Sequence, residues 1–214
     1  MTLSFPQYTL SERISDGCVH VLGVTASLIA ASILIGFAIT SLPALSTASI
    51  VIYSLGMVAV FCFSAAYNLV TKPRIKAFLR RCDHAAIYVK IAATYTPFAL
   101  VKMGGVPGVG LMVFVWTIGI IGVVAKIGWP AQLVRTSYVL YLAQGWACVA
   151  AFSPLSSAVT ERVLILLVVG GVLYTLGVIF HLWTSLRHHN AIWHGFVLTA
   201  SACHFAAVVD ALSS

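Results

Sequence analysis

The sequence has very little charge for its length. Of its 214 residues, only 8% are Asp, Glu, Lys or Arg, whereas 61% are hydrophobic, and the mean hydropathy is +1.03. Soluble domains carry about 25% charged residues. This scarcity excludes an ordinary soluble globular protein and predicts an integral membrane protein. Because each spanning helix needs about 20 residues, little of the chain remains for a separate soluble domain.

Other features are absent as well. No C-x-x-C spacing occurs among the five cysteines, and we expect them to be buried small residues (Cys18, Cys62, Cys82, Cys148 and Cys203). The net charge is +7, but no basic domain is present that could lie along nucleic acid, so nucleic-acid binding is excluded. The N-terminus lacks the pattern of a cleaved signal peptide, and we interpret residues 1–18 as a cytosolic lead-in.

The hydrophobic residues form seven runs of near-spanning length. They are separated by Pro, Gly and charged residues, which end apolar helices. The sequence therefore predicts an all-α membrane protein, a seven-transmembrane helix bundle within a single domain at 19–212. The predicted spans are 19–40, 47–70, 84–101, 108–125, 133–152, 163–184 and 191–212.

The basic residues predict the orientation of this bundle. Nine of the twelve lie in segments that share one side (Arg13, Lys72, Arg74, Lys76, Arg80, Arg81, Lys126, Arg135 and Arg187), and only Lys102 and Arg162 lie on the other. Since cytoplasmic segments are enriched in Lys and Arg, we expect a cytoplasmic N-terminus and an outside C-terminus. Lys90 falls within the third span, and its stem is long enough to snorkel to the inner interface.

Polar residues from several predicted helices fall in the cytoplasmic half. Ionisable groups at this depth indicate a functional site. Ser64 and Asn68 are four residues apart, as are Asn190 and His194, so each pair shares one helical face. The full set is His20, Ser64, Tyr67, Asn68, Asp83, His84, His181, Asn190 and His194.

Structural roles compete with this interpretation. Asp83 suits a helix N-terminus paired with Arg80 or Arg81, and Ser64 and Asn68 suit hydrogen bonds that join helices. We expect His84, His188 and His189 at the membrane surface and His204 as a separate core histidine.

The lead-in leaves a further question open. Glu12, Asp16 and His20 are spaced by four and would form one stripe if the segment is helical, and Thr9 with Glu12 matches a capping box. Whether Glu12 and Asp16 enter the site stays open at this point.

Five phrases in this order resemble the haemolysin III family, the bacterial branch of the progestin and adipoQ receptor superfamily. They are ERISDGCVHVLG (12–23), SAAYN (64–68), DHAAIYVKIAATYTPF (83–98), GGVLYTLG (170–177) and AIWHGFVLTASACHF (191–205). The resemblance implies a seven-helix bundle in the bacterial inner membrane, with a cytoplasmic N-terminus and membrane lipids as partners. It also implies zinc-dependent hydrolysis of a lipid amide, as proposed for receptors of the superfamily, and the family label implies membrane lysis.

The resemblance also implies a site. Family receptors hold zinc through a histidine at the end of helix two and an H-x-x-x-H pair on helix seven, with Ser and Asp nearby. Ser64, Asp83 and His194 match this pattern, whereas Asn68 and Asn190 stand at two histidine positions. A neutral carboxamide is a poor zinc ligand.

We therefore predict Ser64 and Asp83 as catalytic residues, and Asn68, Asn190, Tyr67 and His84 as the polar cavity. His20, Asp83 and His194 form the alternative zinc set, because two imidazoles and one carboxylate match a catalytic zinc site. Three functions remain: a metal-dependent lipid amide or ester hydrolase, a metal-free lipid-binding or sensing protein, and a lytic, pore-forming protein. The two Asn residues favour the metal-free protein over the hydrolase.

Overall fold

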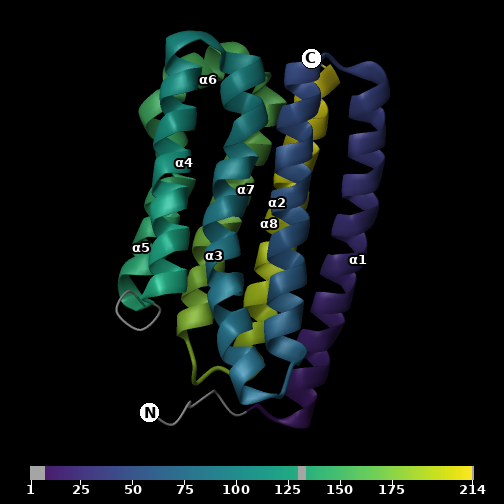
Figure 1. Ribbon diagram of the computed structural model, residues 1–214, viewed down its shortest axis with the longest axis vertical. Coiled ribbons are helices and arrows are strands. Elements are labelled where there is room, and N and C mark those ends of the chain that lie inside the picture. The colour runs from purple at the N-terminus through teal and green to yellow at the C-terminus, as the bar shows by residue number, and fades with distance from the viewer. Residues whose placement is uncertain (1–7, 130–133, 214) are drawn as a thin grey trace.

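The computed structural model describes residues 8–129 and 134–213, and Figure 1 shows them as long helices side by side. These residues form helices and no strand. The helices are α1 (Leu10–Ser41), α2 (Ala44–Leu69), α3 (Pro73–Pro97), α4 (Gly105–Gly128), α5 (Val134–Gly145), α6 (Phe152–Ala158), α7 (Glu161–Leu182) and α8 (His189–Ser213), with a π-helix, η1 (Phe98–Met103), and a 3₁₀ helix, η2 (Ala147–Ala151). The predicted all-α class is confirmed. Residues 1–7 of the predicted lead-in and residue 133 of the fifth span lie outside the described ranges.

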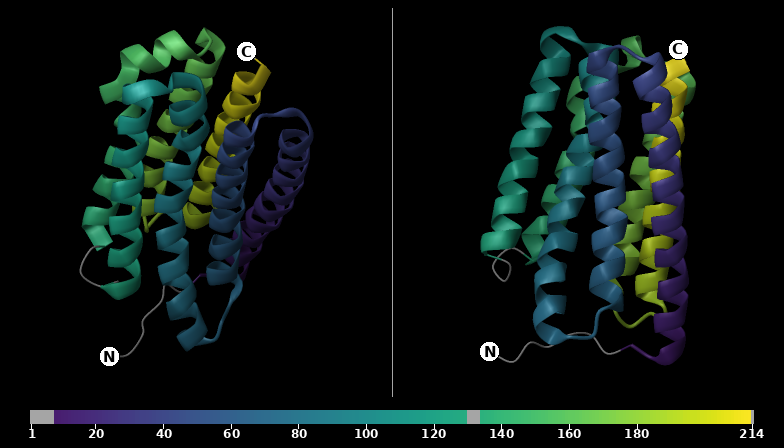
Figure 2. Two further views of the ribbon diagram at one scale, coloured as in Figure 1. Left: turned by 45° about the horizontal axis from the view of Figure 1, so that its top comes forward. Right: turned by 45° about the vertical axis from the view of Figure 1, so that its right-hand side comes forward.

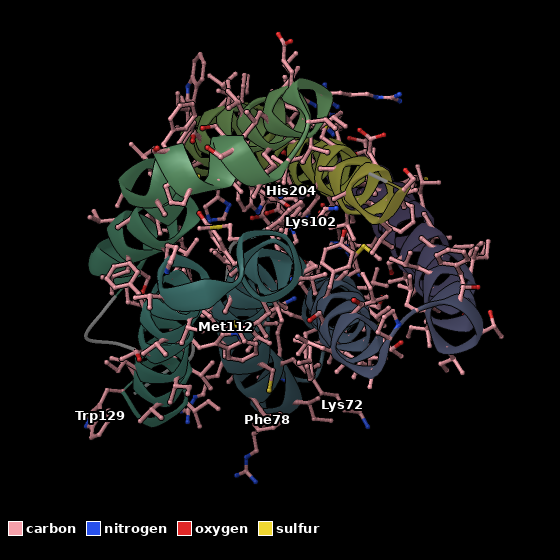
Figure 3. The ribbon with its side chains drawn as sticks, turned by 90° about the horizontal axis from the view of Figure 1, so that it is seen from above. Lys72, Phe78, Lys102, Met112, Trp129 and His204 are labelled. Carbon is pink, nitrogen blue, oxygen red and sulfur yellow. The ribbon has the colours of Figure 1, made fainter. Side chains whose placement is uncertain are left out.

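Six helical segments in the described ranges are long and apolar enough to cross a membrane, namely α1, α2, α4, Ser137–Ala158, α7 and α8. Large apolar side chains cover their outer faces, including Ile33 on α1, Ile120 on α4 and Ile179 on α7. In Figure 3 the labelled Phe78 and Trp129 likewise point away from the bundle, and both are exposed. Such outward apolar surface suits contact with lipid, as expected for a multi-pass membrane protein.

Helix α3 is the segment that hydropathy describes least well. It has 25 residues, but its first turns carry Arg74, Lys76, Arg80 and Arg81. The sequence pattern predicted a span from residue 84, whereas the helix begins at Pro73, because charged residues lower hydropathy without ending a helix and Pro suits the first helical turn. At the other end, Pro97 lacks a backbone donor, and the chain continues as the π-helix η1.

Close packing holds the helices in a ring. Helix α1 packs on α2 and α8, α2 on α3, α3 on α4, and α7 on α8, and the views in Figure 2 agree with this order. At Gly56 of α2, an added Cβ would lie 2.7 Å from the Cβ of Ala93 on α3. Only glycine permits this approach, so α2 positions α3 closely along the cavity described below.

Candidate functional site

A cavity of about 610 Å³ lies inside the ring of helices. Its volume falls within the range of small-molecule sites, about 300–1,000 Å³. Apolar side chains line much of it, among them Phe98, Leu111, Leu155, Leu164 and Leu167. Polar side chains of the predicted cytoplasmic half also line it: His20, Ser64, Tyr67, Asn68, Asp83, His84, His181, Asn190 and His194. The cavity thus combines a long apolar surface with a cluster of polar side chains in the predicted cytoplasmic half.

Helix α1 extends farther toward its N-terminus than hydropathy predicts. It begins at Leu10, behind a capping box in which Thr9 and Glu12 bond each other's backbone. The stripe of Glu12, Asp16 and His20 is therefore helical, as its spacing suggested. Asp16 and His20 are both buried, with 7% and 3% of their surfaces exposed.

Asp16 is the centre of a hydrogen-bond network. Its Oδ1 lies 2.6 Å from Nδ1 of His194, and its Oδ2 accepts a hydrogen bond from Nδ2 of Asn190 at 3.0 Å. The Nε2 atom of His20 lies 3.3 Å from the same Oδ2. One carboxylate thereby connects helix α1 with two residues of α8.

The two Asn residues belong to this network. Asn190 also donates from Nδ2 to Oδ1 of Asn68 at 3.3 Å, and Asn68 donates to the backbone oxygen of Ser64 at 2.9 Å. Both side chains thus serve as hydrogen-bonding residues where the family resemblance implies histidine ligands.

Asp16, His20 and His194 form a group with metal-ligand chemistry. One ligand atom from each lies within 4.8 Å of the others, and all three residues are buried. Nε2 of His20 lies 3.3 Å from Asp16 but forms no hydrogen bond of good geometry with any residue that the structure describes. Two imidazoles and a carboxylate fit zinc, with a fourth position left for water. Of the predicted set His20, Asp83 and His194, the structure brings His20 and His194 together, with Asp16 as the carboxylate of the group.

Asp83 instead lines the cavity beside Ser64, whose hydroxyl is close enough to affect its carboxyl group. Oγ of Ser64 in turn lies 3.4 Å from Nε2 of His194. The alternative pairing of Asp83 with Arg80 or Arg81 is not seen, because among the described residues no basic nitrogen lies within 4.0 Å of its carboxylate. The predicted catalytic pair therefore adjoins the metal-ligating group through Ser64.

The connection between α7 and α8 contacts the start of α1. Ser15 bonds Nδ1 of His188 at 2.8 Å, the backbone N–H of His188 donates to Glu12 at 3.3 Å, and His188 has a left-handed φ of 62°. His189 was expected at the membrane surface, but only 7% of it is exposed, and the centre of its ring lies 5.9 Å from that of Tyr8, with the two rings tilted. Burial raises the pKa of the Tyr8 phenol to about 12, so it stays protonated at neutral pH.

The fold and cavity define a class, namely a multi-pass, all-α membrane protein with a buried polar site inside a largely apolar cavity. Residues 8–205 match the family model described as Haemolysin-III related. The chain belongs to this family, which confirms the resemblance seen in its five phrases.

Named relatives match most of the chain. It is 37% identical over 202 residues to the Hemolysin-3 homolog of Bacillus subtilis (strain 168), covering 94% of this chain and 95% of that protein. It is 34% identical over 200 residues to Hemolysin-3 of Bacillus cereus, covering 94% and 91%. The Monocyte to macrophage differentiation factor of Homo sapiens is 28% identical over 166 residues, covering 73% and 67%. No solved structure matches the chain significantly.

Proposed function

We propose that this chain hydrolyses an amide or ester bond of a membrane lipid at the polar end of its cavity. The observation that carries the proposal is the convergence of Asp16, His20 and His194 within 4.8 Å, beside a largely apolar cavity. An acyl chain matches the apolar lining, and the polar residues match the carbonyl group at its end.

The proposal includes a seven-span bundle in the bacterial inner membrane, with the N-terminus in the cytoplasm. Helix α3, with 25 residues, supplies the seventh span. The start of α1, the α2–α3 connection with the first turns of α3, and the α7–α8 connection lie at one end of the bundle (Figure 1). Together they carry seven of the twelve basic residues. This distribution supports a cytoplasmic placement of the polar site.

The residues of this chain have separate roles in the proposed reaction. Asp16 holds Nδ1 of His194, so Nε2 of that ring points to the hydroxyl of Ser64. Asn190 fixes the second oxygen of Asp16. Asp83, beside Ser64, is positioned to accept or return a proton. A zinc ion held by Asp16, His20 and His194 would take the place of the proton between Asp16 and His194, polarise the carbonyl and lower the pKa of a bound water.

The test measures metal content and hydrolysis on the purified, detergent-solubilised protein. His20→Gln removes one proposed ligand, and His181→Gln removes a cavity histidine outside the group. We expect about one zinc per chain in the unmodified protein and in His181→Gln, as a single three-ligand site requires, and loss of zinc and of lipid hydrolysis in His20→Gln. Hydrolysis that persists in His20→Gln and in the presence of a chelator contradicts the metal-dependent reaction.

A second candidate is metal-free lipid binding. The specific observation is the 2.6 Å between Asp16 and His194, which is a hydrogen-bond distance, whereas two tetrahedral ligands at 2.0–2.2 Å from one zinc lie about 3.3 Å apart. Asn68 and Asn190 complete the same network. Lipid binding without zinc in the unmodified protein, and zinc only in an Asn68→His plus Asn190→His variant, would favour this candidate.

A further inference from the structure

Lys90 of α3 is a buried cation away from the metal-ligating group. The sequence suggested that it snorkels to the interface, but it is only 5% exposed and lines the cavity. Its Nζ donates to the hydroxyl of Tyr174 on α7 and lies 4.1 Å from the centre of that ring. The Tyr174 hydroxyl is 2.6 Å from Oγ of Ser201 on α8. Lys90, Tyr174 and Ser201, here called the Lys90 group, thus join three helices, and Lys90 and Tyr174 line the cavity.

The Lys90 group lies well apart from the acidic residues of the cavity. Lys90 is seven residues beyond Asp83 on α3, and Ser201 is seven residues beyond His194 on α8. Seven residues of helix rise about 10 Å, so two helices independently give the same separation. Among the described residues, no carboxylate oxygen lies within 4.0 Å of the Lys90 ammonium.

His204 adds a second polar observation at this level. Its ring lies 5.5 Å from Tyr174, and it lines the cavity within the ring of helices (Figure 3). Nε2 contacts the backbone oxygen of Leu167 at 3.3 Å, while the buried Nδ1 has no hydrogen-bond partner among residues 8–129 and 134–213. His204, which the sequence predicted to be a separate core histidine, therefore forms a hydrogen bond to the described residues through only one of its two ring nitrogens.

The cavity changes character beyond the Lys90 group. Phe98 is eight residues farther along α3, and Leu167 is seven residues from Tyr174 on the antiparallel α7, so both lie about 10–12 Å farther from Asp83 than the group does. Both line the cavity, as do Leu155 and Leu164. An apolar compartment therefore continues from the cation toward the end of the bundle opposite the metal-ligating group.

A buried lysine without an acidic partner is costly to keep charged at membrane depth, and a bound anion would offset that cost. The two hydroxyls beside Lys90 can turn donors toward such an anion. We propose that the Lys90 group binds the anionic head of a single-chain amphiphile, a carboxylate or a phosphate monoester, whose acyl chain fills the apolar compartment. This proposal rests on the cavity being a lipid site, as in the proposed function, but not on hydrolysis or on a metal.

The test measures binding of three radiolabelled ligands to the full chain in nanodiscs: palmitate, palmitoyl lysophosphatidate and the uncharged methyl palmitate. Lys90→Met keeps the length of the side chain and removes its charge. Lys72→Met is the matched control, because Lys72 is exposed in the α2–α3 connection. Loss of a charge-assisted hydrogen bond predicts at least about a tenfold weaker affinity for the anionic ligands in Lys90→Met, with no change for methyl palmitate and none in Lys72→Met.

Tyr174→Phe keeps the ring and removes one hydroxyl, so it tests the group without deleting the cation, and we expect weaker anion binding there too. Anions that bind the unmodified protein and Lys90→Met equally overturn the proposal. Methyl palmitate binding as tightly as either anion also overturns it while the lipid cavity survives. If none of the three ligands binds, the anion site and the lipid cavity both fail. Palmitate alone identifies a carboxylate ligand, and lysophosphatidate alone identifies a phosphate ligand.

Discussion

Asp16→Asn tests the network at the centre of the site. The change keeps the shape of the side chain but removes the charge that holds His194 at 2.6 Å and Asn190 at 3.0 Å. Hydrogen bonds to charged groups contribute about 1.5–3 kcal/mol each. The Asn side chain keeps one acceptor oxygen, but its amide N–H group now faces one of the two donors, His194 or Asn190. One hydrogen bond of the network is therefore lost, and one buried donor is left unpaired. The expected destabilisation is about 3–5 kcal/mol, the range for breaking a buried charged pair.

The assay is the thermal unfolding midpoint in detergent. One kcal/mol shifts Tm by about 2–4 °C in a chain of this size, so we expect a decrease of about 6–20 °C. Asp210→Asn is the control, since Asp210 pairs only at 3.9 Å with the exposed Arg162, a pair worth about 0–1 kcal/mol. Equal Tm shifts in the two variants would refute the central role of Asp16.

Three further results are expected. The added Cβ of Gly56→Ala would meet Ala93 at 2.7 Å, and because overpacking costs about 1–3 kcal/mol, this variant should lower Tm by about 2–12 °C. Gly36→Ala is the control and should not lower Tm, since its added Cβ would meet no described atom of another helix within 4 Å. Similar decreases in the two variants would contradict the close approach of α2 and α3. Thr9→Ala should reduce the stability of the first turn of α1 by about 1 kcal/mol, and Thr9→Ser should reduce it much less. The measurement is the amide hydrogen exchange rate in that turn, which should rise in Thr9→Ala; an unchanged rate would contradict the cap. Asn68→His plus Asn190→His should bind zinc more tightly than the unmodified protein, because both carboxamides become imidazoles, measured as the zinc retained against increasing chelator. Equal retention would mean that these positions do not face the metal-ligating group.

Much of the fold was predictable because apolar runs have nearly the length of spanning helices. The predicted runs 47–70, 108–125 and 163–184 correspond to Ala44–Leu69, Gly105–Gly128 and Glu161–Leu182. The prediction at 133–152 missed the 3₁₀ helix Ala147–Ala151 and the short α6 that follows. Hydropathy cannot detect such breaks, because apolar composition continues across Phe152 while the hydrogen-bond pattern changes.

The site was predictable as a set of residues but not as a geometry. Spacing by four correctly placed Asp16 and His20 on one face of a helix. The sequence could not show, however, that this face lies against His194. In the sequence, Asp83 and Asp16 were equally suitable as the carboxylate of the site. Only the packing of α1 against α8 shows that Asp16 is the one in contact with His194. Lys90 was expected to snorkel because its side chain is long, but Tyr174, 84 residues away in the chain, provides a hydrogen bond inside the bundle.

The site draws its central residues from the two ends of the chain. Asp16 and His20 lie on the first helix, and Asn190 and His194 lie on the last, so the contact between Asp16 and His194 spans 178 positions. During synthesis the first helix is therefore made long before its partner, and Asp16 cannot contact His194 until the last helix has inserted. Completion of the site is thus a marker of complete biogenesis, since a chain truncated before α8 would retain most of its spans and have no site.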